Sequence, residues 1–222
     1  MTLAATQRAL GLAVPEPWLG AVPPVSVGGV FLCFPRGGAG VGAEGDHAWA
    51  AAVVMEGGQV VSRAVVEGEA GAFHEPGLLA MREGPLLAAA VRALKCRPEV
   101  LLVNATGRDH PRRGGLALHL GAMLSLPTVG VTHRPLYATG PWPAPVNGAY
   151  APLRLDGETV GYWLRRRGAW RPLAVHAGWQ VSAAVARSVV ASLEGRARTP
   201  EPLREARRLA RGARSEAGDD GA

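Results

Sequence analysis

The chain has 222 residues, 48% of them hydrophobic, and a formal net charge of +6. These values are typical of a soluble globular protein of one domain with a substantial core. Two cysteines, Cys33 and Cys96, exclude a disulfide framework or a zinc site, and we expect both to be small buried residues in a reducing compartment. Because the sequence shows neither a membrane-spanning apolar run nor a secretory signal, we expect a cytoplasmic protein.

Arginine supplies almost all of the positive charge, since Lys95 is the only lysine. One cluster lies in a predicted hairpin and consists of Arg165, Arg166, Arg167 and Arg171. A second lies near the C-terminus and consists of Arg196, Arg198, Arg204, Arg207, Arg208, Arg211 and Arg214. Phosphate binding requires such basic patches. For the second cluster, a solvated helix face is an equally good interpretation.

Residues 1–24 contain four prolines and form a lead-in, in which Thr2 to Leu12 has the pattern of a short helix. The main domain is expected at 25–212, followed by a flexible tail at 213–222. Val25 to Phe34 is rich in valine and other apolar residues, which predicts a central strand buried on both faces.

A hairpin and a helix follow this first strand. The hairpin pairs Trp49 to Met55 with Gln59 to Val66 across Glu56-Gly57-Gly58. The helix opens at Pro85, because proline suits the first helical position, and it ends before Pro98. The later predicted elements are a helix over Leu116–Leu124, a strand over Pro127–Val131, a hairpin of Ala149–Leu155 and Thr159–Leu164, a strand over Pro172–His176 and a helix over Val181–Leu193.

A short buried strand, Val100 to Asn104, ends in a polar loop that contains glycine. Open α/β sheets bind ligands at the carboxyl ends of their strands. The side chains expected at this end are Asn104, Thr106, Arg108, Asp109, His110, Arg112 and Arg113. Gly107 permits a close approach of backbone to a ligand.

Two phrases in this region, PGLLAMREGP (76–85) and LLVNATGRDHPRRGGLALHLG (101–121), resemble the endonuclease V family, which cuts DNA or RNA near deaminated purines such as inosine. VGGVFLCF (27–34), PTVGVTHRPLY (127–137) and RTPEPLREARRLAR (198–211) match its first strand, a later strand and its last helix. The resemblance implies an α/β, ribonuclease-H-like fold. Its mixed central sheet has three antiparallel strands followed by parallel strands, with helices on both faces.

The resemblance also implies which residues stand at the family's metal-ligand positions. The family places an Asp in the first strand, a Glu after an aromatic-Arg pair, an Asp at the end of the buried strand and a His in a late Gly-His turn. Here these positions are Phe31, Glu83, Asn104 and Trp179. Mg²⁺ needs oxygen ligands, so we expect the Mg²⁺ site to be lost, no cofactor to bind and the metal-dependent nuclease reaction to be absent.

Other family features imply a nucleic-acid site. His74, Glu75, Pro76 and Gly77 replace a tyrosine-containing turn that wedges into the nucleic acid. Asn104, Gly107, Arg112 and Arg113 belong to the loop that holds the flipped base and neighbouring phosphates, and Arg134 keeps a positive charge where the family commonly has a lysine.

Three functions are open at this point. The first is a nuclease-inactive protein that binds inosine-containing or single-stranded nucleic acid. The second is an enzyme with a different reaction in the same cleft, in which Glu83, His110 and His176 act as acid and base on a small molecule. The third is a protein-binding scaffold that exposes Trp142, Trp163, Trp170 or Trp179 in an apolar patch.

Overall fold

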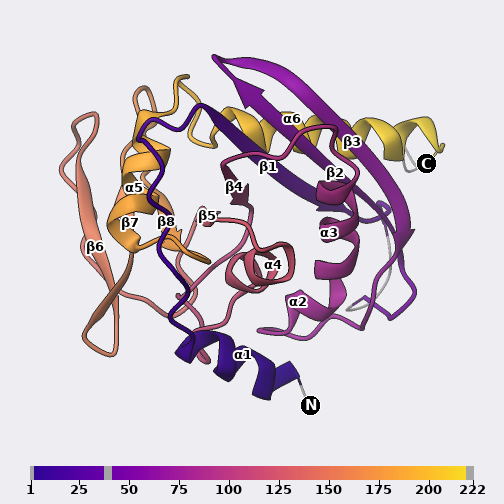
Figure 1. The fold of residues 1–222 in the computed structure, drawn as a ribbon, viewed down its shortest axis with the longest axis horizontal. Coiled ribbons are helices and arrows are strands. Elements are labelled where there is room, and N and C mark those ends of the chain that lie inside the picture. Colours follow the sequence, from indigo (N-terminus) through magenta and orange to yellow (C-terminus); the bar gives the residue numbers. More distant parts are fainter. Residues whose placement is uncertain (1–2, 38–41, 219–222) are drawn as a thin grey trace.

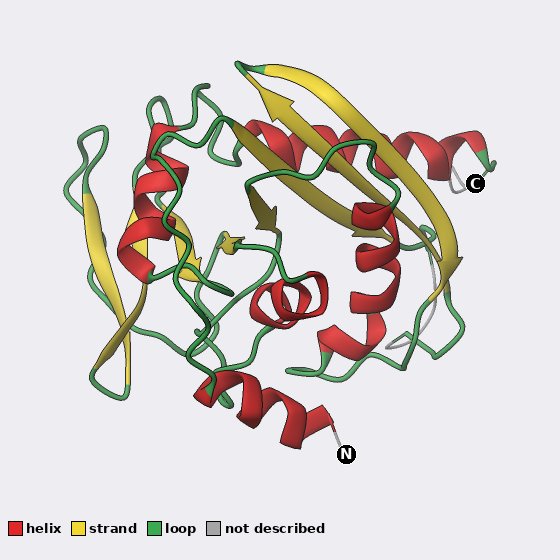
Figure 2. Cartoon of the chain, viewed as in Figure 1, coloured by secondary structure: helices red, strands yellow, loops and turns green. Residues whose placement is uncertain are grey.

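The computed structural model describes residues 3–37 and 42–218, which form one mixed sheet with helices on both faces (Figures 1 and 2). The strands are β1 (Ser26–Cys33), β2 (His47–Glu56), β3 (Gln59–Glu69), β4 (Val100–Val103), β5 (Thr128–Thr132), β6 (Tyr150–Leu155), β7 (Glu158–Leu164) and β8 (Leu173–Ala177). The helices are α1 (Leu3–Leu12), α2 (Leu79–Arg82), α3 (Gly84–Arg92), α4 (Leu116–Leu124), α5 (Ala183–Ser192) and α6 (Glu201–Glu216).

The sheet has eight strands in the order β3-β2-β1-β4-β5-β8-β7-β6. β1, β2 and β3 are antiparallel neighbours, while β1, β4 and β5 run parallel. β8 then pairs antiparallel with β5, and the β6–β7 hairpin completes the sheet. The predicted ribonuclease-H-like order of three antiparallel strands, a helix and a parallel strand is therefore confirmed.

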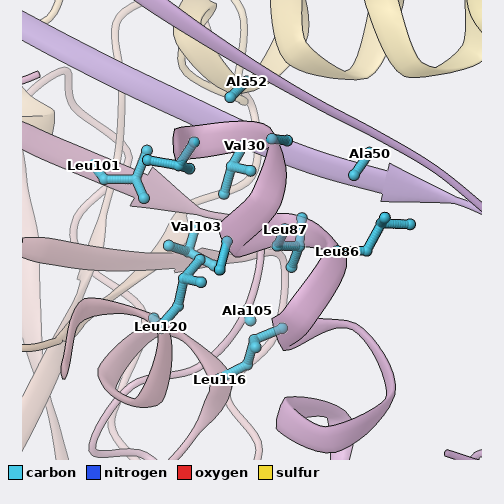
Figure 3. Packing of buried hydrophobic residues seen from close by; sticks show 14 of the residues in the cluster. Val30, Ala50, Ala52, Leu86, Leu87, Leu101, Val103, Ala105, Leu116 and Leu120 are labelled. Atoms are coloured by element: carbon cyan, nitrogen blue, oxygen red, sulfur yellow. The ribbon is translucent and has the colours of Figure 1, made fainter. Parts of the chain in front are cut away.

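Two apolar layers cover the two faces of the sheet. On one face, Val30, Leu101 and Val103 pack against α3 and α4 through Leu87 and Leu120 (Figure 3). On the other face, α5 and α6 cover the strand residues that point in the opposite direction, such as Leu102. This alternation follows from the strand period of two, and it fixes which side chains can meet at the ends of the strands.

The N-terminal segment contains the predicted short helix, whereas the C-terminal segment differs from the prediction as far as Gly218, the last residue described there. Within the lead-in, α1 packs on the loop after β4, and Gln7 is only 1% exposed. At the other end, α6 continues to Glu216, into the segment predicted to be a flexible tail, because its apolar stripe and the buried Arg214 keep it on the sheet.

In the described part of the chain, no helix combines the length and apolar character needed to cross a membrane. Cys33 is buried as expected, but Cys96 is exposed, because it lies in the turn after α3 rather than in the helix itself.

Candidate functional site

The carboxyl ends of β1 and β4 bring Phe31 and Asn104 together. Val30 is the register partner of Val103, so the next residues along these parallel strands are neighbours. Val30, Val103 and Ala105 all face α3 and α4, and Phe31 and Asn104 therefore point to the α6 face. Phe31 is half-buried and Asn104 is exposed.

Arg207 of α6 lies over the ring of Phe31, with 5.6 Å between its guanidinium carbon and the ring centroid. This distance is within the range of a cation–π interaction. The neighbouring part of α6 is fixed by Ala206 and Ala210, which pack against the sheet on either side of Phe31. A hydrocarbon ring and a guanidinium thus occupy the end of the first strand.

Glu83 lies at the start of α3, next to Gly84, whose α-carbon faces Leu116 after the β4 loop. Burial raises the pKa of the Glu83 carboxyl to about 7, and the nearby Arg82 opposes this shift. Arg82 is itself committed to the interior: it donates to the carbonyls of Ala43 and Ala72 and pairs with Asp46 at 2.7 Å. Glu83 therefore carries a titratable proton near neutral pH.

A shallow basic pocket of about 470 Å³ adjoins this edge. It is lined by His133, Ala197, Arg198, Thr199, Glu201, Arg204, Glu205, Arg207, Arg208 and Arg211. The ring of His133, which follows β5, lies 3.0 Å from the hydroxyl of Thr199. Burial lowers the pKa of His133, and Arg198 and Arg207 lower it further, so the imidazole is neutral at pH 7.

The loop after β4 turns its central polar residues inward. Asp109 is fully buried and accepts hydrogen bonds from the backbone N–H groups of Leu136 (2.6 Å), Tyr137 (2.8 Å) and Ala138 (2.7 Å). Its carboxylate also lies 3.6 Å from Nδ1 of His176. Asp109 thereby joins the loop after β4 to the loop after β5.

His176 belongs to this interior network and does not border an accessible cleft with Glu83, as the acid–base hypothesis requires. Its side chain is fully buried, and Nε2 lies 2.7 Å from the hydroxyl of Thr132. Burial lowers the pKa of His176 to about 4, against the opposing effect of Asp109. The burial of His176 could not be read from the sequence. It follows from the position of β8, whose alternating side chains place His176 beneath the loop after β4.

His110 and Arg112 hold the turn at Gly77 instead of facing a ligand. Nε2 of His110 is 3.0 Å from the Gly77 carbonyl, and Arg112 donates to the same oxygen at 3.2 Å. Gln7 of α1 donates to it at 2.8 Å and accepts from Arg112 at 2.6 Å. Burial lowers the pKa of His110, although its contact with Gly77 opposes this shift.

Three other arginines expected to bind phosphate also form ion pairs or hydrogen bonds within the protein. Arg113 pairs with Asp156 at 3.1 Å and with Glu158 at 3.2 Å in the β6–β7 turn. Arg165 and Arg166 are buried, and both donate to backbone carbonyls. Of the four arginines predicted to form a basic patch at this hairpin, only Arg167 and Arg171 are exposed. The other two use their guanidinium groups to bind the carbonyls of neighbouring loops.

Trp179 does not share the edge that holds Phe31 and Asn104. Its backbone N–H donates to the hydroxyl of Thr128, the first residue of β5. Thr128 pairs with Leu101, so Asn104 lies three residues, or about 10 Å, further along the strand direction. The expectation that the Gly178-Trp179 turn faces Phe31, Glu83 and Asn104 is therefore wrong, because β8 runs antiparallel to β5 and ends at the opposite edge.

Other predicted site residues remain accessible. His74, Glu75 and Pro76 are exposed in the turn before α2, and Gly77 completes that turn with a positive φ of 82°. Arg134 is exposed. Gly107, by contrast, packs against β8: an added Cβ would lie 1.9 Å from the Ala177 carbonyl, so glycine here serves packing.

The tryptophans do not form one surface. Trp142 and Trp170 are 58% and 85% exposed, whereas Trp163 is buried and Trp179 half-buried. The scaffold hypothesis required these rings to be presented together, and only two of the four have the necessary exposure.

The sequence alone did not distinguish Arg207 and Arg211 from the other arginines of the C-terminal cluster. A signal was present, since Glu201-Arg204 and Glu205-Arg208 have the spacing that pairs opposite charges along a helix. Subtracting these pairs leaves Arg207, Arg211 and Arg214. Arg214 is buried and donates to the Phe34 carbonyl, so Arg207 and Arg211, four residues apart, are the exposed ones without an ion pair among the described residues. Their position at the Phe31 edge required the tertiary structure.

Possible metal ligands are few among the residues at the positions where the family resemblance implies ligands. Glu83 offers one carboxylate and Asn104 a neutral carbonyl oxygen, whereas the Phe31 ring offers no ligand atom. Within residues 3–37 and 42–218, no group of three or more His, Cys, Asp and Glu side chains is arranged to hold a metal ion.

Comparisons with known proteins agree with the fold and the motifs. The endonuclease V family model matches residues 36–208. Endonuclease V of Nocardia farcinica is 41% identical over 155 residues, covering 69% of this chain and 67% of that protein. Endonuclease V of Streptomyces coelicolor is 39% identical over 172 residues, covering 77% of this chain and 74% of that protein.

Solved structures give the same result. The crystal structure of endonuclease V from Streptomyces avermitilis superposes with a TM-score of 0.84 at 34% identity, covering 97% of this chain and 92% of that one. The catalytic domain of human endonuclease V gives a TM-score of 0.83 at 29% identity, covering 97% and 96%. With the family model matched over most of the chain and relatives of this similarity, the protein belongs to the endonuclease V family.

Proposed function

We propose that this protein binds single-stranded or inosine-containing nucleic acid and does not cleave it by metal-dependent hydrolysis. The observation that carries the proposal is the end of β1, where Phe31 lies under the guanidinium of Arg207. The family resemblance places an acidic metal ligand at position 31. A ring and a fixed cation there disfavour a divalent metal twice, by removing an oxygen ligand and by repelling the ion.

Support for a nucleic-acid partner comes from the family and from the surface. An endonuclease V from Ciona intestinalis, which has the same fold with a TM-score of 0.80 at 18% identity, was crystallised with a 24mer DNA containing an inosine. In this chain the carboxyl edge carries Arg207 and Arg211, and the turn at His74 is exposed beside the loop after β4. Cations at a strand edge attract phosphate, and an exposed imidazole offers a flat ring to a base.

The alternative of an acid–base enzyme has less support. Of its three residues, His176 is enclosed and His110 is held by Gly77. Glu83 alone has a pKa suited to proton transfer at neutral pH. A single titratable carboxyl without an accessible partner is a weak basis for a new reaction, so we favour binding.

The test is fluorescence anisotropy with a labelled single strand that contains one inosine, compared with the same strand containing adenosine. Each strand is titrated with and without Mg²⁺ and across a salt series, and the recovered strand is run on a denaturing gel. We expect tighter binding to the inosine strand, no effect of Mg²⁺ on affinity and intact product. Mg²⁺-dependent cleavage, or no binding of either strand at low salt, would refute the proposal.

A further inference from the structure

The exposed arginines of α6 belong to two different sets. Arg204 pairs with Glu201 at 2.6 Å, and Arg208 pairs with Glu205 at 2.7 Å. Arg207 and Arg211 have no ion pair with any acidic side chain of residues 3–37 and 42–218. The positive charge of the helix that remains available to a ligand is therefore concentrated on these two side chains.

These two arginines share the side of α6 that faces the end of β1. Arg207 is placed over Phe31, and Arg211 lies close enough to Cys33 and Arg36 to interact electrostatically with both. A four-residue separation along a helix is about 6 Å, so the guanidinium groups follow one another along the edge of the sheet.

The surrounding charges increase the need for an anion. Arg207 and Arg36 act on Arg211, and Arg198 lines the same pocket as both Arg207 and Arg211. The two carboxylates of the pocket, Glu201 and Glu205, are each held by their own arginine. Arg207 and Arg211, which pair with no acidic side chain of the described residues, repel each other, and a bound polyanion relieves that repulsion.

We propose that Arg207 and Arg211 bind neighbouring backbone phosphates of a single nucleic-acid strand, with Arg207 supplying at this edge the positive charge that a divalent cation supplies in a metal-dependent nuclease. This inference rests on the proposed function and names the residues that carry it. The Phe31 ring lies beside the Arg207 guanidinium, and the Arg207 side chain is exposed, so its N–H groups can donate two parallel hydrogen bonds to a phosphate.

The experiment compares variants of α6 arginines that differ mainly in whether a glutamate holds them. R207A and R211A are matched with the controls R204A and R208A, which remove the same side chain from the same exposed helix. Affinity for the labelled inosine strand is measured by anisotropy across a salt series, and circular dichroism checks that each variant is folded.

We expect R207A to weaken binding about tenfold. The slope of log binding constant against log salt concentration should fall by about the share of one phosphate contact. R211A should show a similar change of slope. The controls should change affinity by less than about twofold, because loss of their arginine also frees a repelling glutamate.

Two further variants examine the geometry of Arg207. R207K keeps the charge but lacks the planar fork, so it should preserve the salt slope and lose about threefold to fivefold in affinity. F31L keeps an apolar side chain but removes the ring, and we expect a loss of about twofold to fivefold from a less ordered guanidinium.

Each contrary result has a separate meaning. If the full-length protein binds no strand, both the proposed function and this inference fail. If it binds the strand but R204A and R208A weaken binding as much as R207A and R211A, the proposed function stands and this inference fails, because only diffuse charge is involved. Inorganic phosphate is also added at constant ionic strength. If it displaces the strand, and if the affinity for the strand does not depend on strand length, the arginines bind free phosphate and this inference fails.

Discussion

The loop from Gly107 to Arg113 and the edge formed by Phe31, Arg207 and Arg211 are both rich in charge, but their charges are used differently. In the loop, Asp109, Arg112 and Arg113 are each satisfied by groups of the protein. At the edge, Arg207 meets an aromatic ring and Arg211 meets other cations. The loop from Gly107 to Arg113, which carries the family motif, thus stabilises the fold. Helix α6, whose sequence is less distinctive, carries the charge that is available to a ligand.

The strongest test of this contrast is D109A. Loss of the carboxylate leaves three backbone N–H groups without their acceptor, so we expect the free energy of unfolding to fall by about 4 kcal/mol. Urea denaturation followed by circular dichroism measures this loss. If D109A does not fold, D109N provides the measurement, since its amide keeps one acceptor oxygen and should lose about half as much. A loss below about 1 kcal/mol in either variant would mean that the loop is not held from within.

A second test concerns Glu83, which lies at the start of α3. Its folded pKa of about 7 exceeds the ordinary value of 4.5, so the folded protein retains a proton that the unfolded chain loses. Stability from this group is therefore full below about pH 4.5 and declines as pH rises to about 7. Glutamine cannot ionise, and E83Q should be more stable than the natural protein by about 2 kcal/mol at pH 8.

The control for E83Q is the same comparison at pH 4, where the two proteins should have equal stability because the carboxyl is protonated in both states. The lowered pKa of His176 adds its own pH dependence, but it acts on both proteins and cancels. Equal stability of the two proteins at pH 8 would contradict the buried, titratable state of Glu83.

The smallest effect is expected for R112A, which sharpens the contrast with R207A. Arg112 was predicted from the sequence to bind the strand, but its guanidinium contacts Gln7 and Gly77. We expect R112A to lower the free energy of unfolding by about 1 kcal/mol and to leave the salt slope of strand binding unchanged. A reduced salt slope would place the loop against the strand after all.

Much of the fold was readable from the sequence. Apolar runs and turn residues located most strands and helices to within a few residues, including α4 at Leu116–Leu124. The site was less readable. The resemblance associated Phe31 with Asn104, and the structure brings them together because β1 and β4 run parallel. Trp179 was assigned to the wrong end of the sheet, since linear order does not show where an antiparallel strand ends.

The sequence by itself determined most of the helices and strands, the resemblance to the family, and the presence of Phe31 and Asn104 at positions where that resemblance implies acidic ligands. The elements depend on residue types and local periodicity, and the resemblance depends on motifs of consecutive residues, so all of these are present in the linear sequence. Only the tertiary structure decided which charged side chains face outward. Arg112, Arg166 and Arg207 are chemically identical, and what separates them is whether a carbonyl or carboxylate from a distant segment lies within hydrogen-bonding distance.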